Sequence, residues 1–236
     1  MTILAFETSA KAASAALFRE GLLLGETYQN TGLTHSQTLL SMAESLMASC
    51  GITPAEIDAV GVAAGPGSFT GVRIGVAAAK GFAWGRQLPL CGVSTLEAMA
   101  LTLGAWEGTV CSVMDARRSQ VYNALFRAEG GTLTRLREDR AISLEELGRE
   151  LREISGTIYL VGDGSDLTHR TLKDTVPNLA IPPEHRRHQR ASGVALAALR
   201  QIEAGEAVDA ASLVPNYLRL SQAERERLEK QLTIDN

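Results

Sequence analysis

The sequence predicts an α/β protein built from two tandem units, because short apolar strands alternate with amphipathic helices and one segment recurs. Residues 3–21 resemble residues 111–130, and in both copies an apolar strand ends in a carboxylate, Glu7 or Asp115. The tripeptide Leu-Phe-Arg follows each carboxylate ten residues later. A period of about one hundred residues is typical of a duplicated domain, and chance similarity between two amphipathic hairpins is the alternative.

The first half of the chain alternates strands and helices. Segment 65–71 is rich in glycine but lacks the Gly-Lys-Ser/Thr ending of a Walker loop, which favours a tight strand-to-helix turn. The helix after it is apolar or small almost all round and must be covered on more than one side. Gly75 and Ala79 offer a small-residue surface for a second helix. The expected strands are 3–6, 13–18, 22–27, 59–64 and 89–93, and the expected helices are 36–49, 72–84 and 94–103, with a short helix at Pro54.

The second half is expected to be a smaller, degenerate α/β domain. Ser143 and Glu146 form a capping box before a helix over 144–154. Because no low-complexity linker separates the halves, we expect domains 1–105 and 106–236 to meet at a tight hinge. The remaining expected elements are a strand at 158–161, a turn at 162–164, a looser proline-containing region, a helix at 192–204, an extended segment at 214–220 and a terminal helix at 223–232.

Composition excludes several classes of protein. The net charge of -4 argues against nucleic-acid binding along the whole surface, since phosphate neutralisation requires a surplus of Lys and Arg. Cys50, Cys91 and Cys111 lie far apart in apolar surroundings without zinc-ligand spacing, which indicates inert thiols in a reducing compartment. No run approaches the ~18 apolar residues of a membrane span. We therefore expect a cytoplasmic protein with no membrane partner.

A family resemblance appears in the order of these elements and in one long motif. A strand meander, helix, strand and helix, repeated in tandem, resembles the actin-like superfamily of ribonuclease-H-like domains, in which two hairpins clasp nucleotide phosphates. The motif Gly-Pro-Gly-Ser-Phe-Thr-Gly-Val-Arg at 65–73, continued at 79–84 and 92–98, resembles the TsaB (YeaZ) family. That family provides a subunit of the bacterial complex that makes threonylcarbamoyladenosine on tRNA. Shorter agreeing segments are Glu7-Thr8-Ser9, His35, 115–118, 161–164 and 215–219, and the resemblance is weakest at 130–210.

The resemblance implies that the chemistry of the catalytic relative, TsaD, has been lost. TsaD carries a His-x-x-x-His metal pair, and the matching positions here are Thr95 and Met99, which are poor ligands for a hard catalytic ion. The second hairpin turns through 115–118, with arginines where active members have adjacent glycines, and an ion pair to Asp115 is expected there. Glu7 stands where the family usually has an aspartate. The sequence therefore predicts no catalytic, cofactor-binding or metal-ligating residue.

The predicted function is that of a non-catalytic partner subunit for a TsaD-like transferase, with a TsaE-like ATPase as a further partner and tRNA contacted only through the complex. The helices at 36–49 and 72–84 carry excess apolar surface that would complete a four-helix packing with the partner. The alternative is that the two helices bury this apolar surface against each other and against their own sheet. Self-association through this surface is also expected for the isolated chain. The predicted interface residues are His35, Leu39, Met42, Leu46, Phe69, Arg73, Ile74, Ala77 and Ala78.

Two rival functions belong to other classes. An ATPase or sugar-kinase-like phosphotransferase would use Glu7, Asp115 and Asp163. A direct tRNA-binding module would use the basic cluster at 185–190, although charge runs without interleaved aromatic residues are usually solvated faces. His185 and His188 lie beside arginines, which disfavour a metal ion there.

Overall fold

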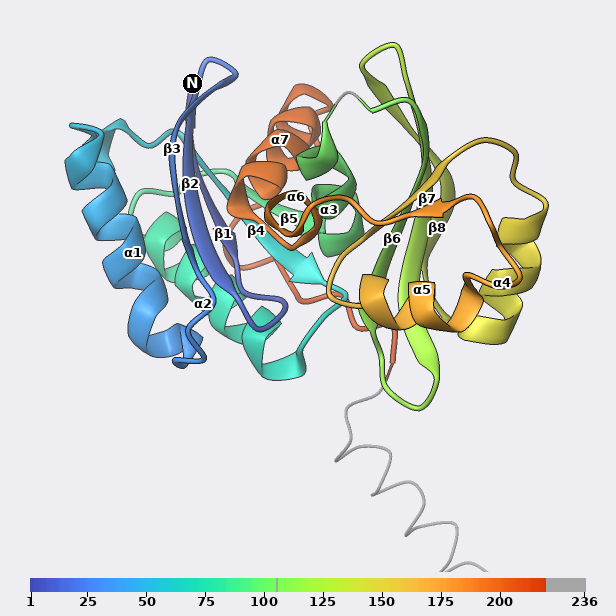
Figure 1. The fold of residues 1–236 in the computed structure, drawn as a ribbon. Helices are drawn as coiled ribbons and strands as arrows, with labels where there is room; N and C mark the ends of the chain where they lie inside the picture. The colour runs from blue at the N-terminus through green and yellow to red at the C-terminus, as the bar shows by residue number, and fades with distance from the viewer. Residues whose placement is uncertain (105, 220–236) are drawn as a thin grey trace, which may run out of the picture.

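The computed structural model describes residues 1–104 and 106–219 and contains two five-stranded sheets next to each other (Figure 1). Their strand orders are β3-β2-β1-β4-β5 and β10-β9-β6-β7-β8. The first sheet consists of β1 (Thr2–Glu7), β2 (Ala13–Arg19), β3 (Leu22–Gln29), β4 (Ala59–Gly65) and β5 (Leu90–Ser94). The second consists of β6 (Gly108–Asp115), β7 (Gln120–Glu129), β8 (Thr132–Ser143), β9 (Ile158–Val161) and β10 (Leu179–Ala180).

The two sheets share one topology. In each sheet the central strand pairs antiparallel with the next strand and parallel with a later one: β1 with β2 and β4, and β6 with β7 and β9. The repeated segments 3–21 and 111–130 contain the two equivalent hairpins, β1–β2 and β6–β7. The mixed α/β class is therefore confirmed, and the origin of the second sheet by duplication stays a prediction.

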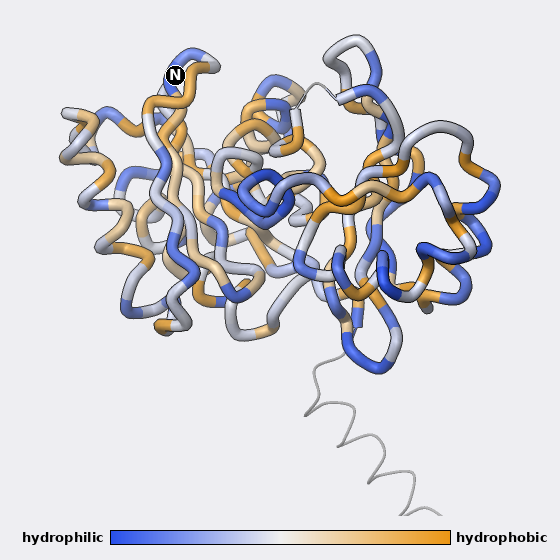
Figure 2. Tube along the Cα trace, in the orientation of Figure 1, coloured by the Kyte–Doolittle hydropathy of each residue, from blue (hydrophilic) through white to orange (hydrophobic). Residues whose placement is uncertain are grey.

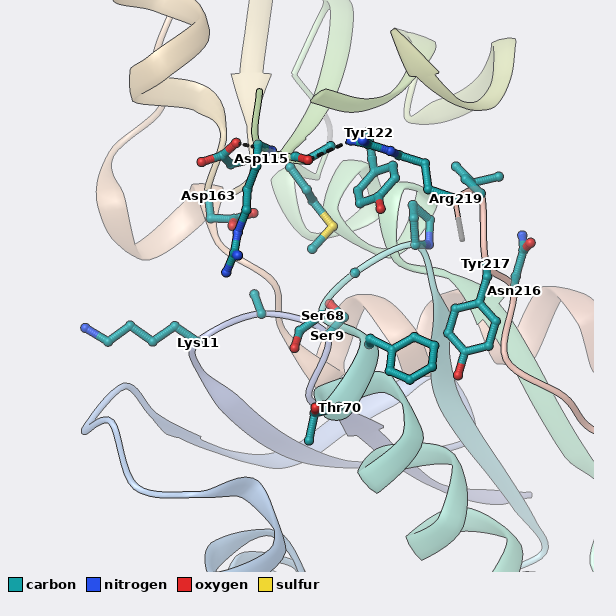
Figure 3. Close-up of a pocket in the computed structure, with 18 residues that line it drawn as sticks. Ser9, Lys11, Ser68, Thr70, Asp115, Tyr122, Asp163, Asn216, Tyr217 and Arg219 are labelled. Atoms are coloured by element: carbon teal, nitrogen blue, oxygen red, sulfur yellow. Dashed lines mark hydrogen bonds between the residues drawn. The ribbon is translucent and has the colours of Figure 1, made fainter. Parts of the chain in front are cut away.

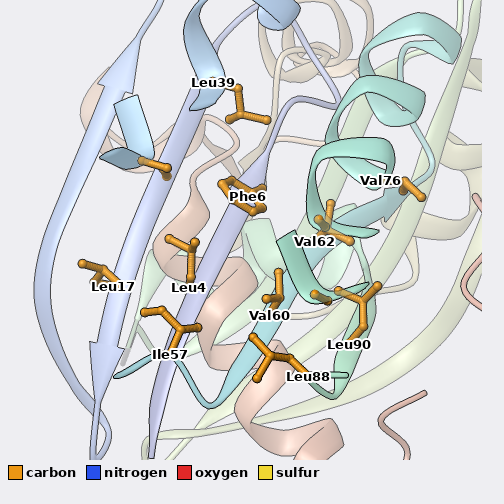
Figure 4. Close-up of a cluster of buried hydrophobic side chains, with 14 of the residues drawn as sticks. Leu4, Phe6, Leu17, Leu39, Ile57, Val60, Val62, Val76, Leu88 and Leu90 are labelled. Atoms are coloured by element: carbon orange, nitrogen blue, oxygen red, sulfur yellow. The ribbon is translucent and has the colours of Figure 1, made fainter. Parts of the chain in front are cut away.

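Helices cover both faces of the first sheet. The helices α1 (His35–Ser49) and α2 (Phe69–Trp84) pack on one face, over the large buried side chains of β1 and β4 (Figure 4). On the opposite face, α7 (Ala191–Glu203) contacts β1, β2, β4 and β5 through a row of alanines. Small residues let this helix approach the sheet closely.

The second sheet is covered more thinly. The helices α4 (Leu144–Arg152) and α5 (Ser165–Leu172) pack on one face, and α3 (Thr95–Leu103) packs on the other. Figure 2 shows hydrophobic residues along the strands of both sheets and hydrophilic residues at hairpin turns and outer helix faces. Two short helices, η1 (Pro54–Glu56) and α6 (Glu184–Arg187), lie in connecting segments.

The predicted boundary at residue 105 separates the two sheets but not the helices that cover them. Because α7 covers the first sheet and also packs on α3, residues from the end of the described chain complete the first unit (Figure 1). A boundary drawn in sequence order cannot represent a helix that follows the second sheet in the chain but packs on the first. The alanine-rich sequence of α7 does not indicate which sheet it covers. The division into 1–105 and 106–236 stays a prediction, and the structure adds that α7 packs against the first sheet.

Three local expectations also change. The helix expected at 72–84 begins at Phe69, because the Ser68 hydroxyl caps it by accepting a hydrogen bond from the Gly71 backbone N–H. Gly75 and Ala79 face their own sheet rather than a second helix, since a Cβ at Gly75 would lie 3.4 Å from Val62. The region after 164, expected to be loose, contains α5.

The helix expected at 223–232 lies outside the described residues. Within the part of the chain that the structure describes, no helix is both long enough and apolar enough to cross a membrane.

Candidate functional site

A cavity of about 570 Å³ lies between the two sheets, beyond the carboxyl ends of their central strands (Figure 3). The β1–β2 turn and the start of α2 form one wall, and the β6–β7 turn with Asp163 forms the other. A C-terminal segment, 216–219, closes one side. Because ligands of open α/β sheets bind at such strand ends, this cavity is the candidate functional site.

The glycines before α2 serve close packing rather than phosphate binding. A Cβ at Gly67 would lie 2.6 Å from the Ser9 carbonyl oxygen, which is closer than any real side chain allows. The Ser68 backbone N–H donates to the same carbonyl oxygen at 2.6 Å, and the Thr8 hydroxyl donates to the Gly71 carbonyl oxygen at 2.8 Å. The interpretation of 65–71 as a tight turn is thus confirmed, with a left-handed backbone only at Gly65 (φ 120°).

The three acidic candidates occupy one region, at different depths. Glu7 is buried, its Oε1 accepts a hydrogen bond from the Ser9 backbone N–H, and its Oε2 has no partner among the described residues. Burial, together with the nearby Asp163 carboxylate, raises the pKa of Glu7 to about 7. Asp163 is exposed to the cavity, and partial loss of water around its carboxyl group raises its pKa while a hydrogen bond from Gln189 lowers it. A buried carboxyl group such as that of Glu7, whose raised pKa disfavours the ionised form, is a poor ligand for a cation.

The residues present do not suit the metal site of the catalytic relative. Thr95 and Met99 are buried in α3, and Met99 packs in the apolar cluster between α3 and the second sheet. Its sulfur would lie 2.9 Å from a Cβ at Gly162, so the thioether fills this space. Among residues 1–104 and 106–219, no group of three or more His, Cys, Asp or Glu side chains is placed to hold a metal ion.

The β6–β7 turn is built differently from the expected ion pair. Asp115 Oδ1 accepts a hydrogen bond from the Arg117 backbone N–H at 2.7 Å, and neither arginine of the turn forms an ion pair with it. Arg117, Arg118 and Ser119 all have positive φ angles (62°, 55° and 56°). Of these three residues Arg117 lines the cavity, where a glycine would leave more room for phosphates.

The predicted interface residues divide between the core and the surface. Leu39, Met42 and Leu46 are buried in the single chain, because α1 lays this face on β2 and β3. These three residues therefore offer no free surface, and a Leu46→Glu test of the interface would unfold the core instead. His35 Nε2 donates to the Ala10 carbonyl oxygen at 2.8 Å and fixes the start of α1 against the β1–β2 turn.

The apolar surface that remains exposed on α1 and α2 is small. Arg73 and Ala77 are exposed, and Ile74 is half-buried. Leu40 and Trp84 expose 56% and 65% of their surface, and neither was singled out from the sequence. Leu40 could have been found from its spacing, since it lies one residue beyond the buried stripe of α1. The other half-buried interface candidates are Phe69 and Ala78.

The basic cluster at 185–190 is largely engaged in contacts within the chain. Arg187 pairs with Asp166, while Arg190 pairs with Glu26 and covers the Tyr28 ring at 4.4 Å. Burial and the neighbouring Arg187 lower the pKa of His188. These contacts leave little free positive charge for nucleic acid.

The three cysteines are free thiols. Burial raises the pKa of Cys91 to about 11 and that of Cys111 to about 12, so neither forms a thiolate near neutral pH. The expectation of inert thiols is confirmed for these two residues.

Comparisons with known proteins match a family model named TsaD and relatives named TsaB. The matching family model, described as TsaD: tRNA N6-adenosine threonylcarbamoyltransferase, covers residues 29–227. The chain is 33% identical over 232 residues to the tRNA threonylcarbamoyladenosine biosynthesis protein TsaB of Bacillus subtilis, covering 98% of this chain and 100% of the relative. It is 36% identical over 169 residues to the protein of the same name from Escherichia coli, covering 70% and 72% of the two chains. The solved structure of YeaZ from Pseudomonas aeruginosa has a TM-score of 0.72 and 26% identity, over 92% of this chain and 99% of that one.

Two sheets of equal topology around one cavity, with these relatives, define an α/β protein of the actin-like class. Within that class the alignment with TsaB extends over almost the whole length of both chains. The chain belongs to the TsaB (YeaZ) family.

Proposed function

We propose that this chain is a non-catalytic subunit of the complex that forms N6-threonylcarbamoyladenosine on tRNA. The observation that carries the proposal is its 33% identity to TsaB of Bacillus subtilis across 98% of the chain, since that protein is named for this biosynthesis. The non-catalytic part rests on the core packing of Met99 and on the arginines of the β6–β7 turn. The second domain is then a degenerate copy of the first.

The proposed partners follow from the family. A TsaD-like transferase supplies the metal site and transfers the threonylcarbamoyl group, and a TsaE-like ATPase joins the complex. tRNA reaches this chain only through the complex, which places the protein in the cytoplasm, and the isolated chain forms a homodimer. The binding surface for the transferase is here called the partner face, and it consists of the half-buried Ile74 with six exposed residues of α1 and α2: Leu40, Thr70, Arg73, Ala77, Gly81 and Trp84.

The test mixes the purified chain with its host's TsaD-like protein, TsaE-like protein and tRNA, and measures threonylcarbamoyl transfer. We expect the chain to be inert alone and required in the mixture. An exposed arginine in place of a small contact residue should obstruct docking, so Ala77→Arg should weaken binding to the TsaD-like subunit by about 100-fold. Leu40→Glu should act in the same direction.

A matched control is Ala204→Arg, which places the same side chain at an exposed position just after α7. It should leave both binding and the melting temperature unchanged. Full binding by a correctly folded Ala77→Arg variant would reject the partner face, and activity without the chain would reject the proposed function.

The relatives do not favour the alternative, an ATP-dependent phosphotransferase or ATPase of the same fold. That alternative requires Mg-ATP binding by the isolated chain and loss of turnover in Asp115→Asn. We expect calorimetric titration with Mg-ATP to show no binding by the isolated chain.

A further inference from the structure

Arg73 is held in one position by two aromatic side chains. Its guanidinium carbon lies 3.7 Å from the centre of the Phe69 ring and 5.6 Å from that of Tyr217. Its Nε donates a hydrogen bond to the Tyr217 hydroxyl oxygen at 2.7 Å. The two rings contact each other, with centres 4.9 Å apart. An exposed arginine is ordinarily free to rotate, and these contacts fix this one before any partner arrives.

The terminal amino groups of Arg73 have no acidic partner among residues 1–104 and 106–219. Within the described part of the chain, its side-chain hydrogen bond uses Nε, and no carboxylate there lies within 4.0 Å of the guanidinium. The other charged residue of α2, Lys80, donates instead to the carbonyl oxygens of Ala211 and Leu213 at 3.2 and 2.9 Å. Arg86, just after α2, donates to three backbone carbonyl oxygens. Arg73 is therefore the charged residue of α2 whose side chain is held in position and whose terminal amino groups have no partner among the described residues.

Helix α2 itself has no acidic side chain near Arg73. The first turn of α2 contains no acidic residue, and the neighbouring exposed positions on the helix are the short Thr70, Ala77 and Gly81. A second chain can approach such a surface closely enough to remove water from the guanidinium. Loss of water strengthens a charge-assisted hydrogen bond, and a planar guanidinium binds a carboxylate through two parallel bonds.

We propose that Arg73 is the electrostatic anchor of the partner face and binds an aspartate or glutamate side chain of the TsaD-like subunit. Phe69 and Tyr217 act as positioning residues, since they hold the guanidinium in place while its terminal nitrogens make no hydrogen bond with the described residues. The inference rests on the proposed function, because it names the chemistry of the partner at that same face. The C-terminal segment brings Tyr217 against Phe69 at the start of α2 (Figure 3).

The test measures the dissociation constant of the full-length chain and its host's TsaD-like subunit by calorimetry at two salt concentrations. Charge reversal in Arg73→Glu should weaken binding by about 100-fold or more, as for a desolvated interfacial charge pair. Arg73→Lys keeps the charge but loses the bidentate geometry, and should cost about tenfold. Tyr217→Phe keeps the ring and removes the acceptor for Nε. It should cost a few-fold while keeping the salt dependence of the wild type.

Arg152→Glu is the matched control, since Arg152 is exposed at the end of α4 and the net charge changes equally. It should bind as the wild type does. Wild-type affinity in Arg73→Glu, with binding still lost in Ala77→Arg, would overturn the anchor and leave the proposed function standing. Absence of binding by the wild-type chain would overturn both. A smaller salt dependence in Arg73→Lys than in Arg73→Glu would also contradict a charge pair at this position.

Discussion

Glu7 is the residue whose environment departs most from that of an ordinary carboxyl group. It ends β1, is fully buried, and has one oxygen without a hydrogen-bond partner in the described part of the chain. Its pKa is raised from 4.5 to about 7, chiefly by burial. The folded chain therefore holds a proton on Glu7 at pH values where the unfolded chain has lost it, and stability falls as pH rises through this window.

Glu7→Gln should remove this part of the pH dependence. Between pH 5 and pH 8 the ionisation of Glu7 costs the wild type roughly 2–3 kcal/mol of unfolding free energy. The glutamine variant should lose less stability over the same range, because it has no proton to release. Urea unfolding at both pH values gives the comparison, and Glu44→Gln on the exposed side of α1 should keep the wild-type fall. An equal fall in Glu7→Gln would mean that Glu7 ionises normally.

At the residue scale, the sequence predicted which thiols are buried and unreactive. It did not predict toward which neighbour a helical side chain points. Buried, unreactive Cys91 and Cys111 follow from apolar neighbours in sequence, and the structure agrees. The prediction of Leu46 as an interface residue did not account for the burial of its side chain within this chain. Helical spacing groups residues on one face but does not say whether that face meets the chain's own sheet or another molecule.

At the scale of the elements, the packing position of helix α7 could not be predicted from its own sequence. It packs on α3 so closely that a Cβ at Gly193 would collide with the backbone carbonyl oxygen of Ala98. Its alanine-rich sequence predicted the helix, yet only the tertiary contact determines which sheet it covers. The same limit explains α5, whose eight residues, flanked by Asp163 and by prolines, gave no strong periodic signal.

Gly193→Ala should lower the stability of the chain, because the added methyl group forces α7 away from α3. Overpacking of this kind typically costs about 1–3 kcal/mol, which chemical denaturation resolves easily. The matched control is Gly81→Ala in α2, where nothing lies within 4 Å of the added Cβ. That change should stabilise the chain by up to ~1 kcal/mol through helix propensity. If both variants shifted stability the same way, the close α3–α7 contact would be wrong.

At the scale of the whole molecule, the C-terminal segment joins parts that are distant in sequence. Leu213 is buried in the first core, the Asn216 backbone N–H donates to the Ala64 carbonyl oxygen at 2.7 Å, and Arg219 donates to the Ala116 carbonyl oxygen of the second sheet. The segment thus runs from α2 across the cavity edge to the β6–β7 turn. The sequence marked 215–219 as part of a family motif, but an extended segment carries no periodicity that would reveal its contacts.

Lys80→Met should loosen this segment without disturbing the cores, because methionine keeps most of the apolar stem and removes the donor to Ala211 and Leu213. Loss of charge-assisted bonds worth roughly 1.5 kcal/mol should speed hydrogen exchange of the Asn216 amide by about tenfold. Lys11→Met, on the exposed β1–β2 turn, should leave that exchange rate unchanged. Because Tyr217 follows Asn216, the same variant should bind the TsaD-like subunit a few-fold more weakly. Unchanged Asn216 exchange would show that contacts other than Lys80 hold the segment. Faster hydrogen exchange at Asn216 combined with wild-type affinity for the TsaD-like subunit would show that this segment does not contribute to the positioning of Arg73.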